Sequence, residues 1–590
     1  MSDYTTLAEL IKNSIERFGE RPYLGTKIAG TYRWLTYAEF DIKMRKLRAA
    51  LHRFGLKKGD VVAIIANNSV PFALTMYASY GLGAVMVPMY EVQRPQDWDF
   101  ILRNSNARFL FVTNDTIRTQ IEALHIENLE KIITIRSEDP QSPHSFDRII
   151  EEETGFMDHI ALDPDSDADI LYTSGTAGQP KGVVLSHANI VENVKRVLSC
   201  FSISETDRTL AFLPWAHAFG KTTELHAFPS LGASVALVES NRTIAQNLLE
   251  INPTVLVAVP KIFNKIYDTV HQRAQNKPIA KTLLAHSEYI AQKARRNQEL
   301  SAFNKLQRVV LDRLVGKKIR AAFGNALRFC ISGGAALSEE VAFFFDDFGV
   351  VICEGYGLSE SGPIVAVNTP DDRRIGAAGK PLPGVPVRIE PLADQTDSQQ
   401  GEIIVGGPCI MKRYHLAPEE TANALTDNHE LRTGDMGFID SDGNLWVTGR
   451  VKEQYKLENG KYVVPSVLES KICASSIIEN AIVLGAGKPY NVALIQPSSD
   501  FLESFKAEHH LINAAPETLQ NNPKLRDLIA TELKNTCERF RGYERPQKFA
   551  IILNEPSIAN GLLTPTLKLK RREVEKQYHS LIASLYTHAN

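Results

Sequence analysis

A stretch without any charged side chain, between Asp60 and Glu91, leaves this chain few ways to fold. A membrane-spanning helix needs about 20 apolar residues, and the stretch is long enough for one. Asparagine, proline and glycine interrupt it, however, and divide it into an apolar run at 61–66, a helical segment at 72–84 and a second apolar run at 85–90. This pattern predicts two buried parallel strands joined by a helix, a βαβ unit rather than a membrane span.

Similar apolar runs and helical segments alternate along most of the first 260 residues. Further runs of strand length lie at 107–115, 131–137, 234–240 and 254–260. This alternation predicts an α/β fold with largely parallel sheets.

Beyond about residue 380 the pattern changes to short strands separated by turns, which indicates an antiparallel β region. After Arg450 it changes again to a mixture of strands and helices. We therefore predict a large N-terminal domain, residues 1–450, whose β-rich part covers about 381–450. A small, mobile α+β C-terminal domain would comprise residues 451–590.

Composition and charge narrow the class of protein. The 590 residues include 66 Lys and Arg against 69 Asp and Glu, a formal net charge of −3. Because nucleic-acid-binding proteins usually carry a basic excess, we expect no nucleic-acid partner. Six scattered cysteines form no CxxC pair and no HExxH pattern occurs, which excludes the common zinc motifs and favours a reducing cytoplasm. Residues 1–22 mix acidic and basic side chains, unlike a signal peptide.

Residues 281–320 depart from this balance of charge. They hold ten Lys and Arg against Glu288, Glu299 and Asp312, a local net charge of +7. The apolar residues of the segment recur at roughly helical spacing. One interpretation is a solvated helical hairpin, and the other is contact with anionic phospholipid headgroups. The second interpretation would place a cytoplasmic protein peripherally on the inner face of a membrane.

The strongest local pattern is the run ILYTSGTAGQPKGVVLSHANI over residues 170–190. Glycine lets backbone N–H groups approach an anion, hydroxyl groups donate further hydrogen bonds, and lysine adds a positive charge. The loop is not a Walker A motif, because Pro180 stands where that motif has glycine and a strand follows instead of a helix. The pattern predicts a phosphate-binding loop that uses Thr173, Ser174, Gly175, Thr176, Gly178 and Lys181.

The loop TSGTAGQPKG resembles the phosphate loop of the adenylate-forming superfamily: acyl-CoA synthetases, luciferases and the adenylation domains of peptide synthetases. Ala177 stands where the family usually has threonine, so one hydroxyl group is missing. Five further segments resemble the other family motifs and follow in the family order: LPWAH (213–217), SGGA (332–335), GYGLSE (355–360), TGD (433–435) and GR (449–450).

The resemblance implies how ATP is bound. The adenine ring would stack on Tyr356, which precedes Gly357 in the motif. The hydroxyl group of Ser359, in place of the commoner threonine, would lie near the α-phosphate. The adenine would also lie against the turn formed by Gly333, Gly334 and Ala335.

The resemblance also implies a metal site, a ribose site and an acyl site. Glu360 and Thr176 would hold Mg²⁺ through oxygen atoms, as this hard cation requires. Asp435 and Arg450 would bind the ribose hydroxyl groups. His217 would line the site of the carboxylate and the acyl chain, with Trp215 as a further candidate for its wall.

Three segments resemble the long-chain fatty acid branch of the superfamily: VPKIFNKIY (259–267), KLENGKYVVP (456–465) and LTPTLKLKRR (563–572). The last segment aligns Lys568 with the catalytic lysine of the family, and Leu567 replaces the usual glycine. Lys570 is the alternative candidate for this lysine.

The resemblance implies that the C-terminal domain turns about Lys452 between two half-reactions. The turn would withdraw Lys568 and bring the segment from Lys456 to Gly460 to the site for the step that uses coenzyme A. Closure about a hinge that assembles different sets of residues is an established switching mode.

The resemblance implies an ATP- and Mg²⁺-dependent enzyme that activates a long-chain fatty acid to acyl-AMP and transfers the acyl group to CoA. The sequence leaves two alternatives. The first is a fatty acyl-AMP ligase that delivers its product to a carrier protein. The second is a catalytically silent homologue that binds acyl-adenylate or lipid.

Overall fold

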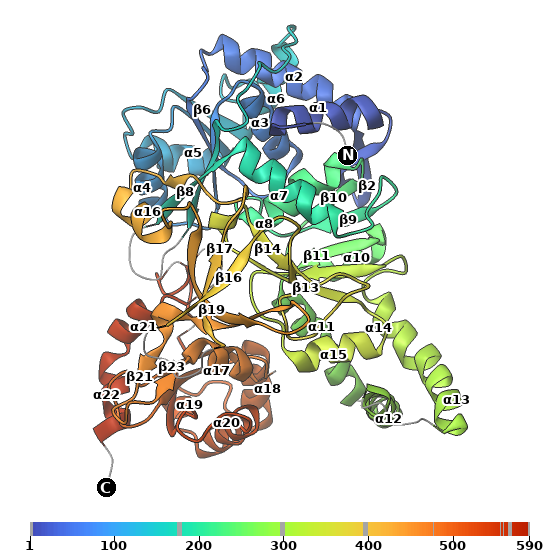
Figure 1. Ribbon diagram of the computed structural model, residues 1–590, viewed down its shortest axis with the longest axis vertical. Helices are drawn as coiled ribbons and strands as arrows, with labels where there is room; N and C mark the ends of the chain where they lie inside the picture. Colours follow the sequence, from blue (N-terminus) through green and yellow to red (C-terminus); the bar gives the residue numbers. More distant parts are fainter. Residues whose placement is uncertain are drawn as a thin grey trace.

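The computed structural model describes most of the chain, namely residues 4–173, 180–275, 277–295, 301–392, 399–475, 477–554, 556–558, 560–564 and 569–587. The N-terminal three-quarters form the upper and central parts of the molecule in Figure 1, and the C-terminal part, coloured orange to red, forms its lower left. The predicted α/β fold class is confirmed.

The largest sheet contains the predicted βαβ unit. Its strand order is β18-β8-β7-β4-β3-β5-β6, and β3, β4, β5 and β6 are parallel. The strands are β3 (Val61–Ile65), β4 (Val85–Met89), β5 (Phe109–Asn114), β6 (Lys131–Arg136), β7 (Asp167–Thr173), β8 (Lys181–Ser186) and β18 (Arg413–Tyr414). The surrounding helices are α1 (Leu7–Phe18), α2 (Tyr37–Arg53), α3 (Val70–Gly81), α4 (Pro95–Ser105), α5 (Asp115–Glu122), α6 (Phe146–Glu152) and α7 (His187–Ser199).

Helix α3 explains why the stretch between Asp60 and Glu91 carries no charge. Its residues from Phe72 to Gly81 are all buried, so every side of the helix packs against protein. The Ser69 side chain caps its first turn by accepting a hydrogen bond from the Phe72 N–H at 3.2 Å. Among the described residues, no helix combines the length and the apolar character that crossing a bilayer requires.

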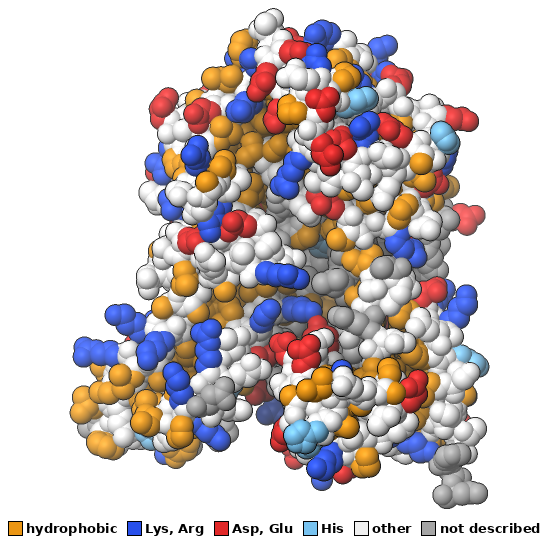
Figure 2. All heavy atoms as spheres, turned by 180° about the vertical axis from the view of Figure 1, so that it is seen from behind, with side chains coloured by type: hydrophobic (Ala, Val, Ile, Leu, Met, Phe, Trp, Pro, Cys, Tyr) orange, Lys and Arg blue, Asp and Glu red, His pale blue; other side chains and the backbone are white. Residues whose placement is uncertain are grey.

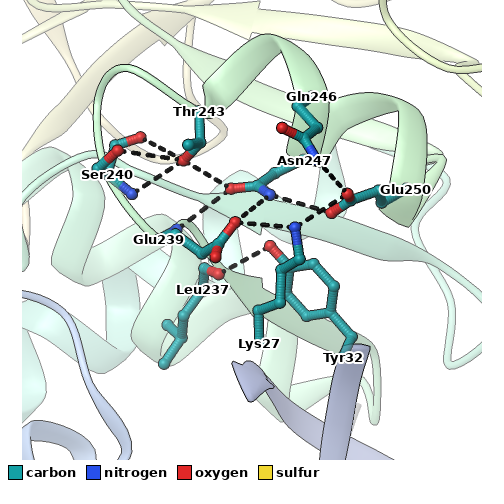
Figure 3. Close-up of polar contacts among 9 residues, drawn as sticks. All are labelled: Lys27, Tyr32, Leu237, Glu239, Ser240, Thr243, Gln246, Asn247 and Glu250. Carbon is teal, nitrogen blue, oxygen red and sulfur yellow. Dashed lines mark hydrogen bonds and ion pairs between the residues drawn. The ribbon is translucent and has the colours of Figure 1, made fainter. Parts of the chain in front are cut away.

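A second sheet has the order β2-β1-β10-β9, with β1 (Pro22–Ile28), β2 (Thr31–Thr36), β9 (Arg208–Ala211) and β10 (Ser234–Leu237). Polar contacts attach its N-terminal hairpin to α10 (Ile244–Ile251). Lys27 Nζ lies 3.0 Å from Glu239 Oε2 and 2.9 Å from Glu250 Oε1, and Tyr32 donates its hydroxyl to the Leu237 carbonyl at 3.1 Å (Figure 3). These bonds fix β1 and β2 against an element more than 200 residues away.

The third sheet carries two of the predicted motifs at its strand ends. Its order is β11-β12-β13-β14-β15, with β11 (Val255–Ala258), β12 (Phe329–Ser332), β13 (Ile352–Gly357), β14 (Ile364–Val367) and β15 (Lys380–Pro381). The strands β11, β12 and β13 are parallel, so the SGGA turn after β12 and the GYGLSE segment at the end of β13 meet at one edge.

The chain between β11 and β12 forms a helical excursion at the lower right of Figure 1. It consists of α11 (Pro260–Gln275), α12 (Pro278–Arg295), α13 (Ala302–Leu311), the π-helix η2 (Asp312–Gly316) and α14 (Lys317–Ala321). After β12 the chain continues through α15 (Glu339–Asp347), which packs against α11 and α12.

The predicted antiparallel β region is confirmed. It forms a sheet of β16 (Val387–Pro391), β17 (Gly401–Val405), β19 (Leu431–Ile439) and β20 (Leu445–Arg450), in which every strand pair is antiparallel. The short helix α16 (Pro418–Ala424) lies between β18 and β19 in the chain.

The C-terminal part has its own sheet and its own buried clusters. The sheet consists of β23 (Ile478–Leu484), β24 (Val492–Pro497) and β25 (Lys548–Ile551). The accompanying helices are α17 (Pro465–Ile472), α18 (Ser499–Glu508), α19 (Pro516–Gln520), α20 (Pro523–Thr536), α21 (Arg571–Gln577) and α22 (His579–Thr587).

Candidate active site

The predicted phosphate loop joins two antiparallel strands, as its strand–loop–strand pattern indicates. Thr173 at the end of β7 is the register partner of Lys181 at the start of β8. These two residues therefore fix both ends of the loop. The predicted phosphate-binding residues Ser174, Gly175, Thr176 and Gly178 lie outside the described residues.

The lysine of the loop and the predicted metal ligand both contact Tyr414, which no sequence motif indicates. Lys181 Nζ lies 5.3 Å from the ring centroid of Tyr414, and Tyr414 donates its hydroxyl to Glu360 Oε1 at 2.8 Å. Burial raises the pKa of Tyr414, and the Glu360 carboxylate raises it further. Tyr414 lies here because β18 pairs with β8, and no local sequence pattern predicts that pairing.

Glu360 lies in the short 3₁₀ turn η3 (Ser359–Ser361), just after β13. The Met411 N–H donates to the Glu360 carbonyl at 2.8 Å, which ties this turn to the segment before β18. Gly357 must be glycine, because a Cβ atom there would lie 1.8 Å from the Pro363 carbonyl oxygen. The tight turn therefore places Ser359 and Glu360 beside the end of the phosphate loop.

The predicted ribose residues form one hydrogen-bonded group with the predicted adenine residue. Tyr356 donates its hydroxyl to Asp435 Oδ2 at 2.7 Å, and Arg450 Nε lies 2.8 Å from Asp435 Oδ1. Asp435 and Arg450 are register partners on β19 and β20. A carboxylate offers about four lone-pair positions, so Asp435 can still accept hydrogen bonds from ribose hydroxyl groups.

The glycine turn after β12 packs against Phe219, two residues after the LPWAH segment. A Cβ atom at Gly333 would lie 2.9 Å from Phe219 Cζ, and Gly334 has a φ of +84°, a conformation that favours glycine. Ala335 is exposed at the end of this turn. His217 caps the short helix α8 (Ala218–Gly220), because its Nδ1 accepts from the Phe219 N–H at 3.3 Å. The predicted adenine turn and the predicted acyl segment are therefore neighbours.

Trp215 lies in the protein core, 1% exposed. Its ring meets Phe72 of α3 edge-on at 5.7 Å, and its Nε1–H donates to Glu224 Oε2 at 3.1 Å. The side chain is therefore held by core packing and by a buried carboxyl group.

A buried ion pair near this segment was not predicted. The π-helix η1 (Lys221–Ala227) is buried over its whole length, and Lys221 pairs there with Asp169 of β7. Tyr80 donates its hydroxyl to Asp169 Oδ1 at 2.8 Å. Burial lowers the pKa of Lys221, and the Asp169 carboxylate opposes that effect. Asp169 precedes Thr173 by four residues, so the pair joins the strand of the phosphate loop to the helix that follows His217.

The predicted hinge and CoA residues lie at the start of the C-terminal part. Lys452 is in the 3₁₀ turn η4 (Val451–Glu453), and Lys456 is exposed in β21 (Tyr455–Lys456). Lys456 Nζ lies 4.6 Å from the ring centroid of Tyr462 in β22 (Tyr462–Val463). Gly460 has a φ of +79° in the turn between these strands.

The predicted catalytic Lys568 lies outside the described residues, but the chain on either side of it is described. Leu563 and Leu569 form an isolated antiparallel bridge. A Cβ atom at Gly561 would lie 3.2 Å from Arg94 Nη1, at the start of α4. The segment before Lys568 therefore approaches the N-terminal part of the molecule.

Comparison with known proteins gives matches over nearly the whole chain. The family described as "AMP-binding enzyme" matches residues 11–415, and "AMP-binding enzyme C-terminal domain" matches residues 452–590. The chain is 32% identical to the long-chain-fatty-acid–CoA ligase FadD15 of Mycobacterium bovis, over 95% of this chain and 93% of that protein. It is 27% identical to the peroxisomal long chain acyl-CoA synthetase 6 of Arabidopsis thaliana, over 99% and 86%.

Solved structures share the fold at lower sequence identity. An anthranilate CoA ligase in complex with anthranoyl-AMP superposes with a TM-score of 0.75 at 21% identity, covering 99% of both chains. The adenylation domain of a carboxylate reductase from Mycobacterium chelonae gives a TM-score of 0.78 at 22% identity, covering 98% of this chain and 91% of that one. Family match, full-length relatives and fold agree with the order of the motifs, and the chain belongs to the AMP-binding enzyme family.

Proposed function

We propose that this protein is a long-chain fatty acid–CoA ligase. It converts a fatty acid and ATP into acyl-AMP and pyrophosphate, and then converts acyl-AMP and CoA into acyl-CoA and AMP. The observation that carries the proposal is that the Tyr356–Asp435–Arg450 group and the Lys181–Tyr414–Glu360 group are both assembled. The names of the full-length relatives support the substrate class and the acceptor.

In this proposal ATP lies along the edge where β12 and β13 end. The adenine ring rests between Tyr356 and the turn of Gly333, Gly334 and Ala335, and the ribose hydroxyl groups bind Asp435 and Arg450. The triphosphate meets Lys181 and the loop that contains Thr173, Ser174, Gly175, Thr176 and Gly178. His217 accepts a hydrogen bond from the Phe219 N–H, and the Phe219 ring lies against Gly333, so the fatty acid carboxylate would reach the α-phosphate from that side.

The residues present fit a magnesium ion. Mg²⁺ in such enzymes is usually held by one or two carboxylates together with phosphate oxygens, rather than by a cage of protein ligands. Among the described residues there is no cluster of three His, Cys, Asp or Glu side chains suited to a metal, and Glu360 is the carboxylate beside the loop. Glu360, with the Thr176 hydroxyl group, would hold the ion, which supplies positive charge at the phosphates.

The first half-reaction needs positive charge, because a carboxylate must attack an anionic phosphate. Lys181 and Lys568 supply that charge to the α-phosphate and to the leaving pyrophosphate. The acyl-adenylate is a reactive anhydride, so the C-terminal domain also has to exclude water while it forms.

The second half-reaction needs a different arrangement of the two domains. We propose a large domain of residues 1–450 and a mobile domain of residues 451–590 with its hinge at Lys452. Rotation withdraws Lys568, and the turn that carries Lys456 and Gly460 replaces it beside the acyl-adenylate, where the CoA thiol attacks the carbonyl carbon.

A ladder of fatty acids of increasing chain length, assayed for AMP release with and without CoA, tests the function. We expect turnover to be greatest with long-chain acids and to require CoA, with acyl-CoA as the product. Acyl-AMP that accumulates and is not passed to CoA would instead identify a ligase that serves a carrier protein. Absence of ATP turnover with every acid would identify a catalytically silent homologue and contradict the proposal.

We also propose that the protein is cytoplasmic and contacts the inner face of an anionic membrane through residues 281–320. The net charge of +7 in this segment supports the contact.

A further inference from the structure

Helix α13, in the helical segment between β11 and β12, is an amphipathic helix whose apolar side is largely exposed. Helix α13 turns Asn304 and Gln307 toward the molecule, where they are partly buried, and His286 Nε2 lies 3.3 Å from Gln307 Oε1. Amphipathic surface helices normally direct their apolar side to the core. Here the apolar side chains lie largely on the outside.

The outward side of α13 and η2 forms an apolar stripe. Its members follow one another at helical spacing and are between 47% and 67% exposed: Phe303, Leu306, Val309, Val310 and Leu314. Leu311 is the buried apolar residue of α13 among those described. Single exposed apolar residues are normal, but a continuous stripe marks an interaction site.

Exposed basic side chains flank the apolar stripe: Lys305, Arg308, Arg313, Lys317 and Lys318. The described acidic residues of the segment already have partners, since Glu288 Oε1 lies 2.9 Å from His271 Nε2 and Asp312 pairs with Arg320 at 2.7 Å. Asp312 and Asp347 also interact electrostatically with Arg308, but the described residues around the stripe still carry a net positive charge. Figure 2 shows hydrophobic and Lys or Arg side chains gathered at the lower left, the end that α12 to α14 occupy.

We infer that the apolar stripe of α13 and η2 inserts into the surface of an anionic phospholipid bilayer while the flanking basic side chains bind the headgroups. Interfacial helices combine these two features, because apolar side chains enter the headgroup–acyl boundary and cations meet anionic lipid. The inference deepens the proposed function and rests on it for its purpose, since a bilayer is where long-chain fatty acids partition.

Charge argues against two other occupants. Two copies of this chain meeting through their stripes would bring five basic side chains of each copy together, and like charges in an interface repel. A nucleic acid would attract the same basic residues but would leave the apolar stripe exposed to water, so it accounts for only half of the surface. An anionic bilayer satisfies both the apolar and the basic side chains.

The double variant Phe303→Glu with Leu306→Glu tests the insertion. We expect wild-type protein to float with phosphatidylcholine vesicles that contain phosphatidylglycerol and to bind vesicles of phosphatidylcholine alone far less. The partition coefficient of the double variant into the anionic vesicles should be at least about tenfold lower, because two inserting side chains become charged. Ile512→Glu, at an exposed apolar residue of the C-terminal part, is the matched control and should bind like wild type.

A second pair of measurements separates insertion from charge alone. The variant Lys305→Glu with Arg308→Glu should weaken binding most at low salt, whereas the loss in the apolar variant should persist at high salt, where screening removes the charge contribution. Emission of a Phe303→Trp variant should shift to the blue on vesicles.

Several results would overturn the inference. Wild-type protein could fail to bind anionic vesicles at low salt, or the Phe303→Glu/Leu306→Glu variant could bind them as wild type does. Wild-type protein could also form a concentration-dependent dimer that this variant does not form. Turnover of a soluble medium-chain acid should be unchanged in the double variant. An enzyme that binds vesicles but ligates no acid would contradict the proposed function and leave the docking surface standing.

Discussion

At the scale of single residues, the carboxylate of Asp435 connects the parts of the candidate site that would hold the nucleoside. One of its oxygens accepts from Tyr356 and the other pairs with Arg450. The pKa of Tyr356 lies well above its usual value, because the side chain is buried and the carboxylate of Asp435 is close. The tyrosine therefore stays protonated and continues to donate to Asp435.

Replacing Asp435 by asparagine should impair the use of ATP more than it impairs folding. An amide offers one acceptor oxygen, so either Tyr356 or Arg450 loses its partner, and a charge-assisted hydrogen bond is worth about 1.5–3 kcal/mol. We expect kcat/KM for ATP to fall about 10- to 100-fold. Asp442→Asn, in the exposed turn before β20, is the control, and an unchanged kcat/KM for ATP in the Asp435 variant would contradict the assignment.

Glu354, two residues before Tyr356, gives a prediction about pH. Burial raises its pKa to about 7, while its Oε1 accepts from the Gly376 N–H at 3.2 Å. The usual pKa of a glutamate is near 4.5, so between these two values the folded state binds a proton that the unfolded state releases. The free energy of unfolding should therefore fall as pH rises from about 4.5 to 7 and stay reduced above it.

Glu354→Gln should remove this dependence, since the amide remains neutral and can still accept from Gly376. The variant should be more stable than wild type at pH 8, by up to about 3 kcal/mol, and the difference should shrink toward pH 5. Melting temperatures across this range measure it, with the exposed Glu127→Gln as control. If wild-type protein were more stable than the variant at pH 8, the predicted direction of the pH dependence would be wrong.

The motifs pointed to those residues of the candidate site that lie within short, ordered patterns. Tyr356, Glu360, Asp435 and Arg450 are of this kind, and the structure brings them together in two groups. Tyr414 could not be predicted, because it lies 54 residues from Glu360 and reaches it only through the pairing of β18 with β8. A single sequence contains no trace of such a long-range contact.

At the scale of secondary-structure elements, local patterns predicted helices and strands best where a segment is buried on all sides. The stretch between Asp60 and Glu91 became two buried strands and a buried helix, because a segment with no polar side to expose has to be enclosed on all sides. The π-helix η1 was beyond such reasoning. Its buried polar residues depend on Asp169 of β7 and on Tyr77 of α3, which donates its hydroxyl to the Leu225 carbonyl at 2.7 Å.

Lys221→Met should destabilise the fold strongly, because it leaves the Asp169 carboxylate buried without its counter-charge. Breaking one side of a buried ion pair costs about 3–5 kcal/mol, whereas replacing both sides by apolar residues often costs little. We therefore expect the double variant Lys221→Met with Asp169→Leu to recover part of the loss in urea denaturation. Lys412→Met breaks a partly exposed ion pair with Asp167 on the same strand, and Arg413 remains as a partner of that carboxylate, so it should change stability by only about 0–1 kcal/mol. Equal losses of unfolding free energy in Lys221→Met and Lys412→Met would show that burial adds nothing to the contribution of the Lys221–Asp169 pair.

At the scale of the whole molecule, the fold class and the change from a parallel to an antiparallel region could be predicted from the sequence. The packing of the C-terminal part against the rest could not, because it depends on contacts between distant surfaces. Lys261 of α11 pairs with Glu479 of β23 at 2.7 Å, and Gly561 approaches Arg94. The Lys261–Glu479 pair is exposed, and exposed ion pairs are weak, which is compatible with the rotation that the proposed mechanism requires.

In the proposed mechanism one chain activates a fatty acid and passes it to CoA, with a different lysine at the site in each step. Separate assays of the two half-reactions in the Lys568→Ala variant distinguish these steps. We expect this variant to lose fatty-acid-dependent exchange of pyrophosphate into ATP but still to convert supplied acyl-AMP and CoA to acyl-CoA. Normal exchange in this variant, or a wild-type protein that forms no thioester from acyl-AMP and CoA, would show that the proposed mechanism is wrong.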